Sequence, residues 1–337
     1  MNVERYRKLI DGFGEKRILV IGDVMLDRFI WGGVSRISPE APVPVVRVRE
    51  ESTYPGGAAN VARNLIPFSH SVDMVGLLGR DGNGEVLLDA LRKGGIGTGG
   101  MVVADDYETI TKTRVIARQQ QVVRFDHERP VLTSPEQVAK VAEFVEGAAG
   151  NLDGLIIEDY GKGFVTQELV DAIVPLAASR DLVVTVDPNA ENRLDWQGVT
   201  AVKPNRSEAF REAGVPEPSE IDVSGADPAQ DPVLLEVGEI LMGRWGAKLL
   251  QVTLGEQGMM LFERGQPPHH IPTKAKAVFD VSGAGDTAIA LFTLALAVGA
   301  SAVEAAEISN YASGVVVGKL GTATLARDEL LEAIERG

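Results

Sequence analysis

The chain has 337 residues, of which 45% are hydrophobic and 24% charged, so it can bury a sizeable core and is not a disordered segment. A formal net charge of -15 argues against nucleic acid or an anionic membrane as a partner, and the lack of cysteine excludes disulfides and thiol chemistry. The N-terminal residues have no apolar signal core, and the longest apolar run, residues 288–300, is too short to span a bilayer. We therefore expect a soluble, cytoplasmic protein.

Short apolar runs rich in β-branched residues alternate with helical patterns along the chain. Strands are predicted at residues 17–22, 72–79, 154–157, 182–186, 201–202 and 249–253, and helices at residues 136–149, 167–179 and 234–245. This alternation is typical of a mostly parallel sheet with helices on both faces, in which ligands bind beyond the carboxyl ends of the strands. Polar residues stand at or just beyond the ends of these runs, at Asp23, Asp159, Asp187, Asn205 and Thr253.

Two regions break the alternation. Residues 43–49, 109–118 and 121–126 are extended patterns with no long helix beside them, which predicts a small β-sheet outside the main layers. Residues 217–232 are rich in Pro, Asp and Ser and predict an exposed loop. We expect one domain over residues 1–337, with lid segments at about 28–51 and 105–128.

Residues 280–287 read Asp-Val-Ser-Gly-Ala-Gly-Asp-Thr and lead into the apolar run. A Gly-Ala-Gly turn before a buried helix presents free backbone N–H groups at the helix N-terminus, where anionic groups are favoured. Asp286 stands at the same place, and a carboxylate there can take a proton from a hydroxyl that attacks phosphorus. The alternative is that Gly283 and Gly285 only form a tight turn and Asp286 is an ordinary first-turn residue.

This motif resembles the second signature of the ribokinase/PfkB family of sugar kinases, and residues 55–62, Pro-Gly-Gly-Ala-Ala-Asn-Val-Ala, resemble the first. The two occur in the family's order and at about its distance. The resemblance implies an α/β, ribokinase-like three-layer α/β/α fold, with a mostly parallel central sheet and a small β-sheet lid over the sugar site. It also implies ATP and Mg²⁺ as cofactors, with a monovalent cation such as K⁺ as a further candidate.

Residues 35–45, Ser-Arg-Ile-Ser-Pro-Glu-Ala-Pro-Val-Pro-Val, resemble one branch of the family, the D-glycero-β-D-manno-heptose 7-phosphate kinases. Residues 22–27, 109–114, 119–126, 159–163 and 315–322 are similar to that branch too. The resemblance implies ATP-dependent phosphorylation of the C1 hydroxyl, giving the 1,7-bisphosphate on the route to nucleotide-activated heptose and lipopolysaccharide. The alternatives are another PfkB-type sugar or sugar-phosphate kinase, and a non-catalytic sugar-phosphate sensor.

The resemblance assigns roles to single residues. The general base would be Asp286, and the anion hole Gly283, Ala284 and Gly285. The sugar would be held by Asp23, Gly56, Gly57, Asn60, Asp159 and Lys162. The nucleotide side would comprise Lys203, Asn205, Arg206, Ser207, Glu208, Thr253, Gly255, Gly258 and Asn310, with Glu208 also serving Mg-ATP indirectly. Taken alone, Asn60 could be a polar residue near a helix start, Glu208 a surface helix residue and Gly258 a hairpin turn.

The lid segments carry a basic cluster in an otherwise acidic chain, formed by Lys112, Arg114, Arg118 and Arg124. Alternate residues of a strand share a face, so Lys112 and Arg114 can point the same way. Lys112, Arg114 and Arg124 are either a clamp for a phosphate on the substrate or the solvated face of an edge strand.

The same segments carry alternating apolar residues at Val43, Val45, Val115 and Phe125. A ribbon this thin cannot bury its own apolar face. We therefore expect a homodimer formed through the lid, with a sugar phosphate and ATP as the small-molecule partners.

Three details qualify the resemblance. Many family members continue Val-Asp-Pro with lysine, whereas this chain has Asn189, which weakens the case for a cation there. The bifunctional members carry a nucleotidyltransferase motif, His-x-Gly-His, that none of the four histidines forms, so we expect a kinase only. His269 and His270 are adjacent and are expected to lie in a loop, not to bind a metal.

Overall fold

The computed structural model describes residues 3–118, 120–129, 131–218, 227–275, 278–319, 321 and 323–337. Its centre is an eight-stranded sheet in the order β14 (His269–Ile271), β13 (Met259–Glu263), β12 (Leu249–Thr253), β11 (Ala201–Val202), β10 (Val183–Asp187), β9 (Gly154–Glu158), β1 (Arg17–Gly22) and β4 (Ser71–Val75). The six strands from β4 to β12 pair in parallel, and β13 and β14 are antiparallel. The prediction of a mostly parallel sheet is confirmed.

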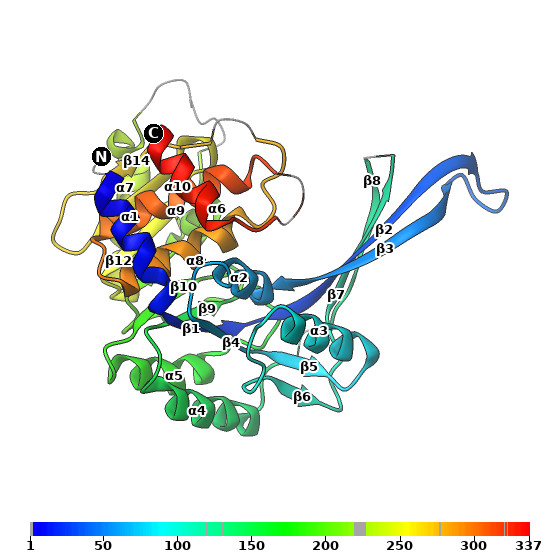
Figure 1. Ribbon diagram of the computed structural model, residues 1–337, viewed down its shortest axis with the longest axis horizontal. Helices are drawn as coiled ribbons and strands as arrows, with labels where there is room; N and C mark the ends of the chain where they lie inside the picture. The colour runs from blue at the N-terminus through cyan, green and yellow to red at the C-terminus, as the bar shows by residue number, and fades with distance from the viewer. Residues whose placement is uncertain are drawn as a thin grey trace.

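Helices cover both faces of this sheet (Figure 1). One face is covered by α1 (Val3–Gly12), α2 (Ala58–Leu65), α8 (Ala284–Ala297), α9 (Ala302–Val316) and α10 (Arg327–Arg336). The other is covered by α4 (Pro135–Ala149), α5 (Gln167–Ala178), α6 (Arg206–Ala213) and α7 (Pro232–Trp245). A further helix, α3 (Gly82–Lys93), lies beside a short sheet of β5 (Leu77–Gly79) and β6 (Val102–Ala104). The result is the predicted three-layer α/β/α arrangement.

The period-two pattern of a strand explains why the sheet needs both layers. In β1, Ile18 and Val20 pack into the core under α8, whereas Leu19 and Ile21 pack into the core under α4 and α5. All four side chains are fully buried. A strand buried on both faces has no polar alternation, which is why residues 18–21 form a continuous apolar run.

A separate four-stranded sheet projects from the body as a long arm (Figure 1). Its order is β3 (Pro44–Gly57), β2 (Val24–Ile37), β7 (Thr111–Ala117) and β8 (Gln120–His127). We call this sheet the lid. Because β1 continues through Asp23 directly into β2, the lid begins at Val24 and runs to Gly57, so it is longer than the predicted segment 28–51.

Two further sequence predictions need correction. The single strand predicted at residues 72–79 is two strands, β4 and β5, which separate at Gly76 and belong to different sheets. A Cβ at Gly76 would come within 2.8 Å of the Val24 side chain, so the close approach of the lid strand accounts for the glycine. His269 and His270 lie in strand β14 and not in a loop, because they pair with β13 at the sheet edge. Sequence reasoning also missed β13 itself.

Parts of some predictions fall outside the described residues. These are residues 219–226 of the predicted loop, residue 119 of the lid, and residues 320 and 322 of the C-terminal motif. Among the described helices, none combines the length and the apolar character needed to cross a membrane. The ranges that the structure describes also hold no group of three or more His, Cys, Asp or Glu side chains placed to bind a metal ion.

Candidate active site

The residues predicted for catalysis meet where the parallel strands end. Helix α8 begins here, and Gly283 precedes it with φ of 80°, a left-handed conformation that favours glycine. Gly285, in the first turn, faces Lys203 and Asp187, since a Cβ there would lie 3.5 Å from the Lys203 Nζ and 3.9 Å from the Asp187 Oδ2. The helix is buried from Asp286 to Ala295, because it packs between the sheet and helices α2 and α9.

Asp286 is held by two hydrogen bonds, one to each carboxylate oxygen. The Asn60 amide donates to Oδ2 at 2.6 Å, and the Tyr160 hydroxyl donates to Oδ1 at 2.9 Å. Only 8% of the Asp286 residue surface is exposed. Burial raises the pKa of Asp286, and the hydrogen bonds from Asn60 and Tyr160 act in the opposite direction. The carboxylate is therefore oriented, largely dry and able to act as a base.

Asn60 is itself fixed by its neighbours on helix α2. Arg63 donates to the Asn60 Oδ1 at 3.1 Å, and Asn64 donates to the Asn60 backbone oxygen at 2.9 Å. Thr287, next to the base, donates to the Asn64 Oδ1 at 2.9 Å. The polar residue near a helix start thus connects the first glycine motif to the second, while its predicted contact with sugar hydroxyls stays a prediction.

A buried charged cluster lies beside the base at the ends of β9, β10 and β11. Lys203 is 3% exposed and forms an ion pair with Asp187 at 2.7 Å. Burial lowers the pKa of Lys203, but the charges of Asp187 and Glu158 outweigh it, so the net direction is upward. Glu158 is 2% exposed, and burial, together with the charges of Asp187 and Asp286, raises its pKa well above the ordinary value.

Asn205 and Glu208 form the start of helix α6. The Glu208 N–H donates to the Asn205 Oδ1 at 2.9 Å, and the Asn205 N–H donates to the Glu208 Oε2 at 2.8 Å. This reciprocal pair is a capping box and gives both residues a structural role in addition to any ligand contact. Burial raises the pKa of Glu208, and the charge of Asp187 adds to it.

Two adjoining hollows contain the predicted nucleotide residues. The first, about 590 Å³, is lined among others by Asp159, Asp187, Lys203, Asn205, Arg206, Ser207, Glu208, Thr253, Gly255 and Gly285. The second, about 490 Å³, shares Thr253, Gly255 and Gly285 with the first and adds Gly258, Ala284 and Asn310. Within it, Asn310 donates to the Pro272 backbone oxygen at 2.6 Å. Gly258 has φ of 89°, and a Cβ there would clash with the Ile271 backbone, so a structural need already accounts for this glycine.

The predicted sugar residues shape the loop after β9. The Asp23 carboxylate accepts backbone N–H groups from Tyr160, Lys162 and Phe164 at 2.9–3.0 Å. Asp159 accepts the Gly161 N–H at 2.8 Å and the Asn192 amide at 2.9 Å. These bonds explain why carboxylates stand at both positions. Contacts of Asp23 and Asp159 with a sugar remain predictions.

Gly56 and Gly57 are required by close approaches at the end of β3. A Cβ at Gly56 would clash with the Asp27 carboxylate. At Gly57 the backbone has φ of 61°, and a Cβ would lie 2.5 Å from the backbone carbonyl oxygen of Asp23. The glycines therefore let the lid strand pass close to the strand that carries Asp23.

The lid cations divide into two kinds. Arg114 pairs with Asp27 at 2.6 Å and lies over the Phe29 ring, and Arg124 pairs with Asp126 and is 49% exposed at its side chain. The Lys112 ammonium, by contrast, lies 5.9 Å from the centre of the Tyr160 ring. Burial lowers the pKa of Lys112, and the charge of Lys162 lowers it further.

The comparisons with known proteins show the family of the chain. A sequence model described as pfkB family carbohydrate kinase matches residues 15–329. The chain belongs to this family. The kinase is 41% identical over 326 residues to a protein of Magnetococcus marinus named bifunctional protein HldE, and the match covers 96% of this chain and 64% of that one. Its identity to the Pseudomonas aeruginosa protein of the same name is 40% over 324 residues, covering 96% and 65%.

Solved structures show the same fold. Phosphofructokinase-2 from Escherichia coli, solved in complex with potassium, superposes on the kinase with a TM-score of 0.75 at 19% identity, covering 96% of this chain and 99% of that one. Ribokinase from Arabidopsis thaliana, solved with ribose and ATP, gives a TM-score of 0.70 at 18% identity, covering 96% and 99%. The ribokinase-like fold is confirmed. The kinase spans a little under two thirds of the length of the first curated relatives that it matches.

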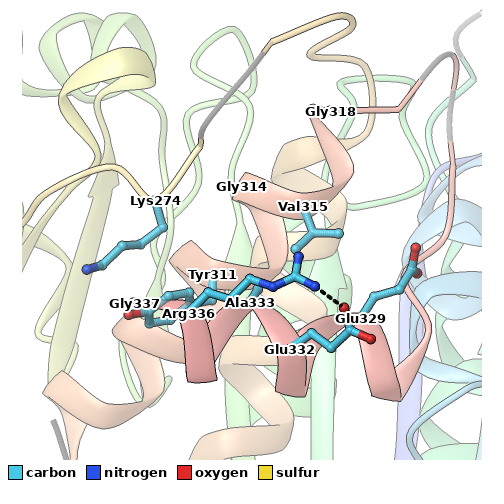
Figure 2. Close-up of a pocket in the computed structure, with 10 residues that line it drawn as sticks. All are labelled: Lys274, Tyr311, Gly314, Val315, Gly318, Glu329, Glu332, Ala333, Arg336 and Gly337. Atoms are coloured by element: carbon cyan, nitrogen blue, oxygen red, sulfur yellow. Dashed lines mark hydrogen bonds and ion pairs between the residues drawn. The ribbon is translucent and has the colours of Figure 1, made fainter.

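Figure 2 shows a third hollow, whose volume is about 340 Å³. It is formed by helices α9 and α10 and by the segment at Lys274, whose ammonium lies 5.1 Å from the centre of the Tyr311 ring. None of the predicted site residues lines it. Its wall at Gly314 also borders the second nucleotide hollow.

Sequence reasoning missed two residues that contact the candidate base or the buried charged cluster beside it. Tyr160 bonds to the candidate base, and Glu158 lies next to the pair of Lys203 and Asp187. A signal for Glu158 did exist, since it is a carboxylate directly after the apolar run 154–157. Tyr160 carried no such signal, because its partner lies 126 positions away in the sequence.

Proposed function

We propose that this kinase transfers the γ-phosphate of ATP to the C1 hydroxyl of D-glycero-β-D-manno-heptose 7-phosphate and forms the 1,7-bisphosphate. The observation that carries the proposal is the position of Asp286. It lies at the start of α8, directly after Gly285, which lines both nucleotide hollows, and the lid lysine Lys112 lies over the tyrosine that bonds to it. The resemblance of residues 35–45 to the heptose 7-phosphate kinase branch supports the choice of a heptose phosphate.

In the proposed reaction Asp286 accepts the proton of the attacking hydroxyl. The hydroxyl oxygen forms a bond to the γ-phosphorus, and the bond from this phosphorus to the bridging oxygen breaks, which releases ADP. Backbone N–H groups in the first turn of α8, which follows Gly283 and contains Gly285, would stabilise the charge that develops on the transferred phosphoryl group. The Lys203 ammonium lies close to this turn and would add to the stabilisation.

Mg²⁺ fits the nucleotide hollow. Glu208 and Asp187 both line it, and Mg²⁺ is commonly held by one or two carboxylates, several waters and the phosphates of the nucleotide. When bound with ATP the ion would neutralise charge on the phosphates, and Glu208 would hold it indirectly. We include K⁺ as a candidate monovalent cofactor, to be tested by replacing it with tetramethylammonium in the assay.

A panel of phosphorylated and plain sugars, followed as ADP release, tests the proposal. We expect the highest kcat/KM with heptose 7-phosphate and a lower value with plain heptose. A clear preference for another sugar or sugar phosphate would replace the heptose by that substrate and leave the kinase chemistry standing. If ATP is consumed with none of them, the site is that of a non-catalytic sensor.

A further inference from the structure

Tyr160 is held at two points next to the candidate base. Its backbone N–H donates to the Asp23 Oδ2 at 2.9 Å, and its hydroxyl donates to the Asp286 Oδ1 at 2.9 Å. Asp23 also accepts the N–H groups of Lys162 and Phe164, so the whole turn after β9 is fastened to one buried carboxylate. The Tyr160 ring therefore has little freedom, and its hydroxyl remains at the base.

The two donors to Asp286 are chemically different. The Asn60 amide nitrogen can only donate a hydrogen bond, whereas a phenol hydroxyl can donate or accept. When Asp286 is ionised, the Tyr160 hydroxyl donates to it, as the structure shows. When Asp286 has taken a proton, the same hydroxyl can turn and accept that proton in a hydrogen bond. Tyr160 can thus stay bonded to the base on both sides of the proton transfer.

The charges around the base make these bonds important. Glu158, Asp187 and Lys203 face Asp286 from the ends of β9, β10 and β11. Burial raises the pKa of Asp286, and after the bond from Asn60 the bond from Tyr160 is the next influence that lowers it. Burial and the nearby carboxylates raise the pKa of Tyr160 well above its ordinary value, so the phenol keeps its proton and remains a donor.

We propose that Tyr160 is a positioning residue for catalysis, which holds Asp286 in its ionised form and aims its carboxylate through the hydroxyl contact. The proposal rests on the proposed role of Asp286 as the base. It adds that a residue outside both glycine motifs sets the acid limit of the reaction. Lys112, over the ring of Tyr160, links this contact to the lid.

The test is Tyr160→Phe, with the pH profiles of kcat and kcat/KM measured for ATP and the sugar phosphate. Without the hydroxyl, one of the hydrogen bonds that lower the pKa of Asp286 is lost, so burial raises this pKa further. Asp286 then holds its proton more tightly, and the acid limb of the kcat profile moves to higher pH. Because a hydrogen bond to a charged group is worth roughly 10–100-fold, we expect kcat on the acid side to fall about tenfold or more. The KM for ATP should stay within about twofold of wild type, since phenylalanine keeps the ring that lines the first nucleotide hollow and loses only the hydroxyl that bonds to the base.

The matched control is Tyr6→Phe. Tyr6 is also a buried tyrosine whose hydroxyl donates to a carboxylate, that of Glu307, but it lies on α1 away from the site. This control should lose some thermal stability and keep the wild-type pH profile. If Tyr160→Phe does not fold, Tyr160→Met takes its place in the same comparison.

The proposal is overturned if the Tyr160 variant and wild type share the same acid limb, whatever the loss in kcat. A loss confined to the KM for the sugar would overturn it too, because the phenol would then be a substrate contact only. These results differ from failure of the base itself, which near-normal turnover in Asp286→Asn would reveal independently.

Discussion

The Asn60 amide donates a 2.6 Å hydrogen bond to Asp286 across 226 positions of sequence. Asn60 belongs to the first glycine motif and Asp286 to the second, so the two family signatures are parts of one hydrogen-bonded unit. Arg63 and Asn64 fix Asn60, and Thr287 ties Asn64 back to helix α8. A carboxylate held this way loses little entropy when it meets a substrate, which suits a general base.

Asp286→Asn keeps the shape of the side chain but removes its ability to accept a proton. We expect kcat to fall by roughly 10²–10⁴, with folding and ATP binding retained. Turnover with heptose 7-phosphate and ATP affinity by calorimetry check this. Asp171→Asn, an exposed change on helix α5, is the control and should leave both unchanged. Near-normal turnover in Asp286→Asn would remove Asp286 from the mechanism.

The two glycines of the turn before α8 should respond differently to alanine. A Cβ at Gly285 meets only ordinary contacts, with Lys203 and Asp187, but it faces the proposed phosphate position. Gly285→Ala should therefore lower kcat while the melting temperature changes little. Gly283 has a positive φ, so Gly283→Ala should cost about 1–2 kcal/mol of stability. Should Gly285→Ala merely unfold the protein, the glycine serves the backbone and not the anion hole.

Asp159 should make stability depend on pH. Burial raises its pKa from 3.8 in an unfolded chain to about 7 in the folded protein. The folded state therefore binds this proton more tightly than the unfolded state, and the contribution to stability is present below pH 3.8 and is lost as pH rises to about 7. The melting temperature of the wild type minus that of Asp159→Asn should fall as pH rises through this window. Above about pH 7 the difference should stay constant. If the melting temperatures of the two proteins differ by the same amount at every pH from 4 to 8, the raised pKa of Asp159 is contradicted.

The lid cations should not contribute equally to substrate binding. Lys112 lies beside Tyr160, so Lys112→Ala should lower the affinity for heptose 7-phosphate by roughly 10–100-fold, which is the contribution of a charge-assisted hydrogen bond. Arg124 is half-exposed and already paired with Asp126, so Arg124→Ala should have a smaller effect. Each variant is titrated with heptose 7-phosphate, plain heptose and ATP, and ATP affinity should change little. Equal losses for both sugars would make the cluster a solvated strand face.

The lid should pair with a second copy of the chain. Val43, Val48 and Phe125 are 51%, 49% and 53% exposed, which is costly for apolar side chains on a thin ribbon. Val115, which was also expected on the apolar face, is already buried within the protomer. Light scattering at micromolar concentration should give a dimer, and Val48→Glu should shift it toward monomer while the exposed Val86→Glu on helix α3 should not. A wild-type protein that is only monomeric would count against the lid as an interface.

Much of the architecture is decided by local sequence. Runs such as residues 18–21 and 155–157 are apolar at every position because strands in a parallel sheet are buried on both faces, and this pattern is visible without a structure. The positive φ at Gly283 favours glycine, so the turn before α8 can also be predicted from the sequence. The departures include β14, at one edge of the sheet, and β13 beside it, because a short edge strand gains its hydrogen bonds from a neighbour that the local pattern does not reveal.

The hydrogen bonds and ion pairs of the candidate site were decided only by tertiary structure. The contacts of Asp286 with Asn60 and Tyr160, and of Arg114 with Asp27, join residues 87 to 226 positions apart. No periodicity records such distances, because each partner is an ordinary residue within its own segment. The sequence therefore determined that a glycine turn and a carboxylate stand at the start of a buried helix. Folding determined which donors reach that carboxylate, which lid arginines are paired with carboxylates, and which lysine lies over the Tyr160 ring.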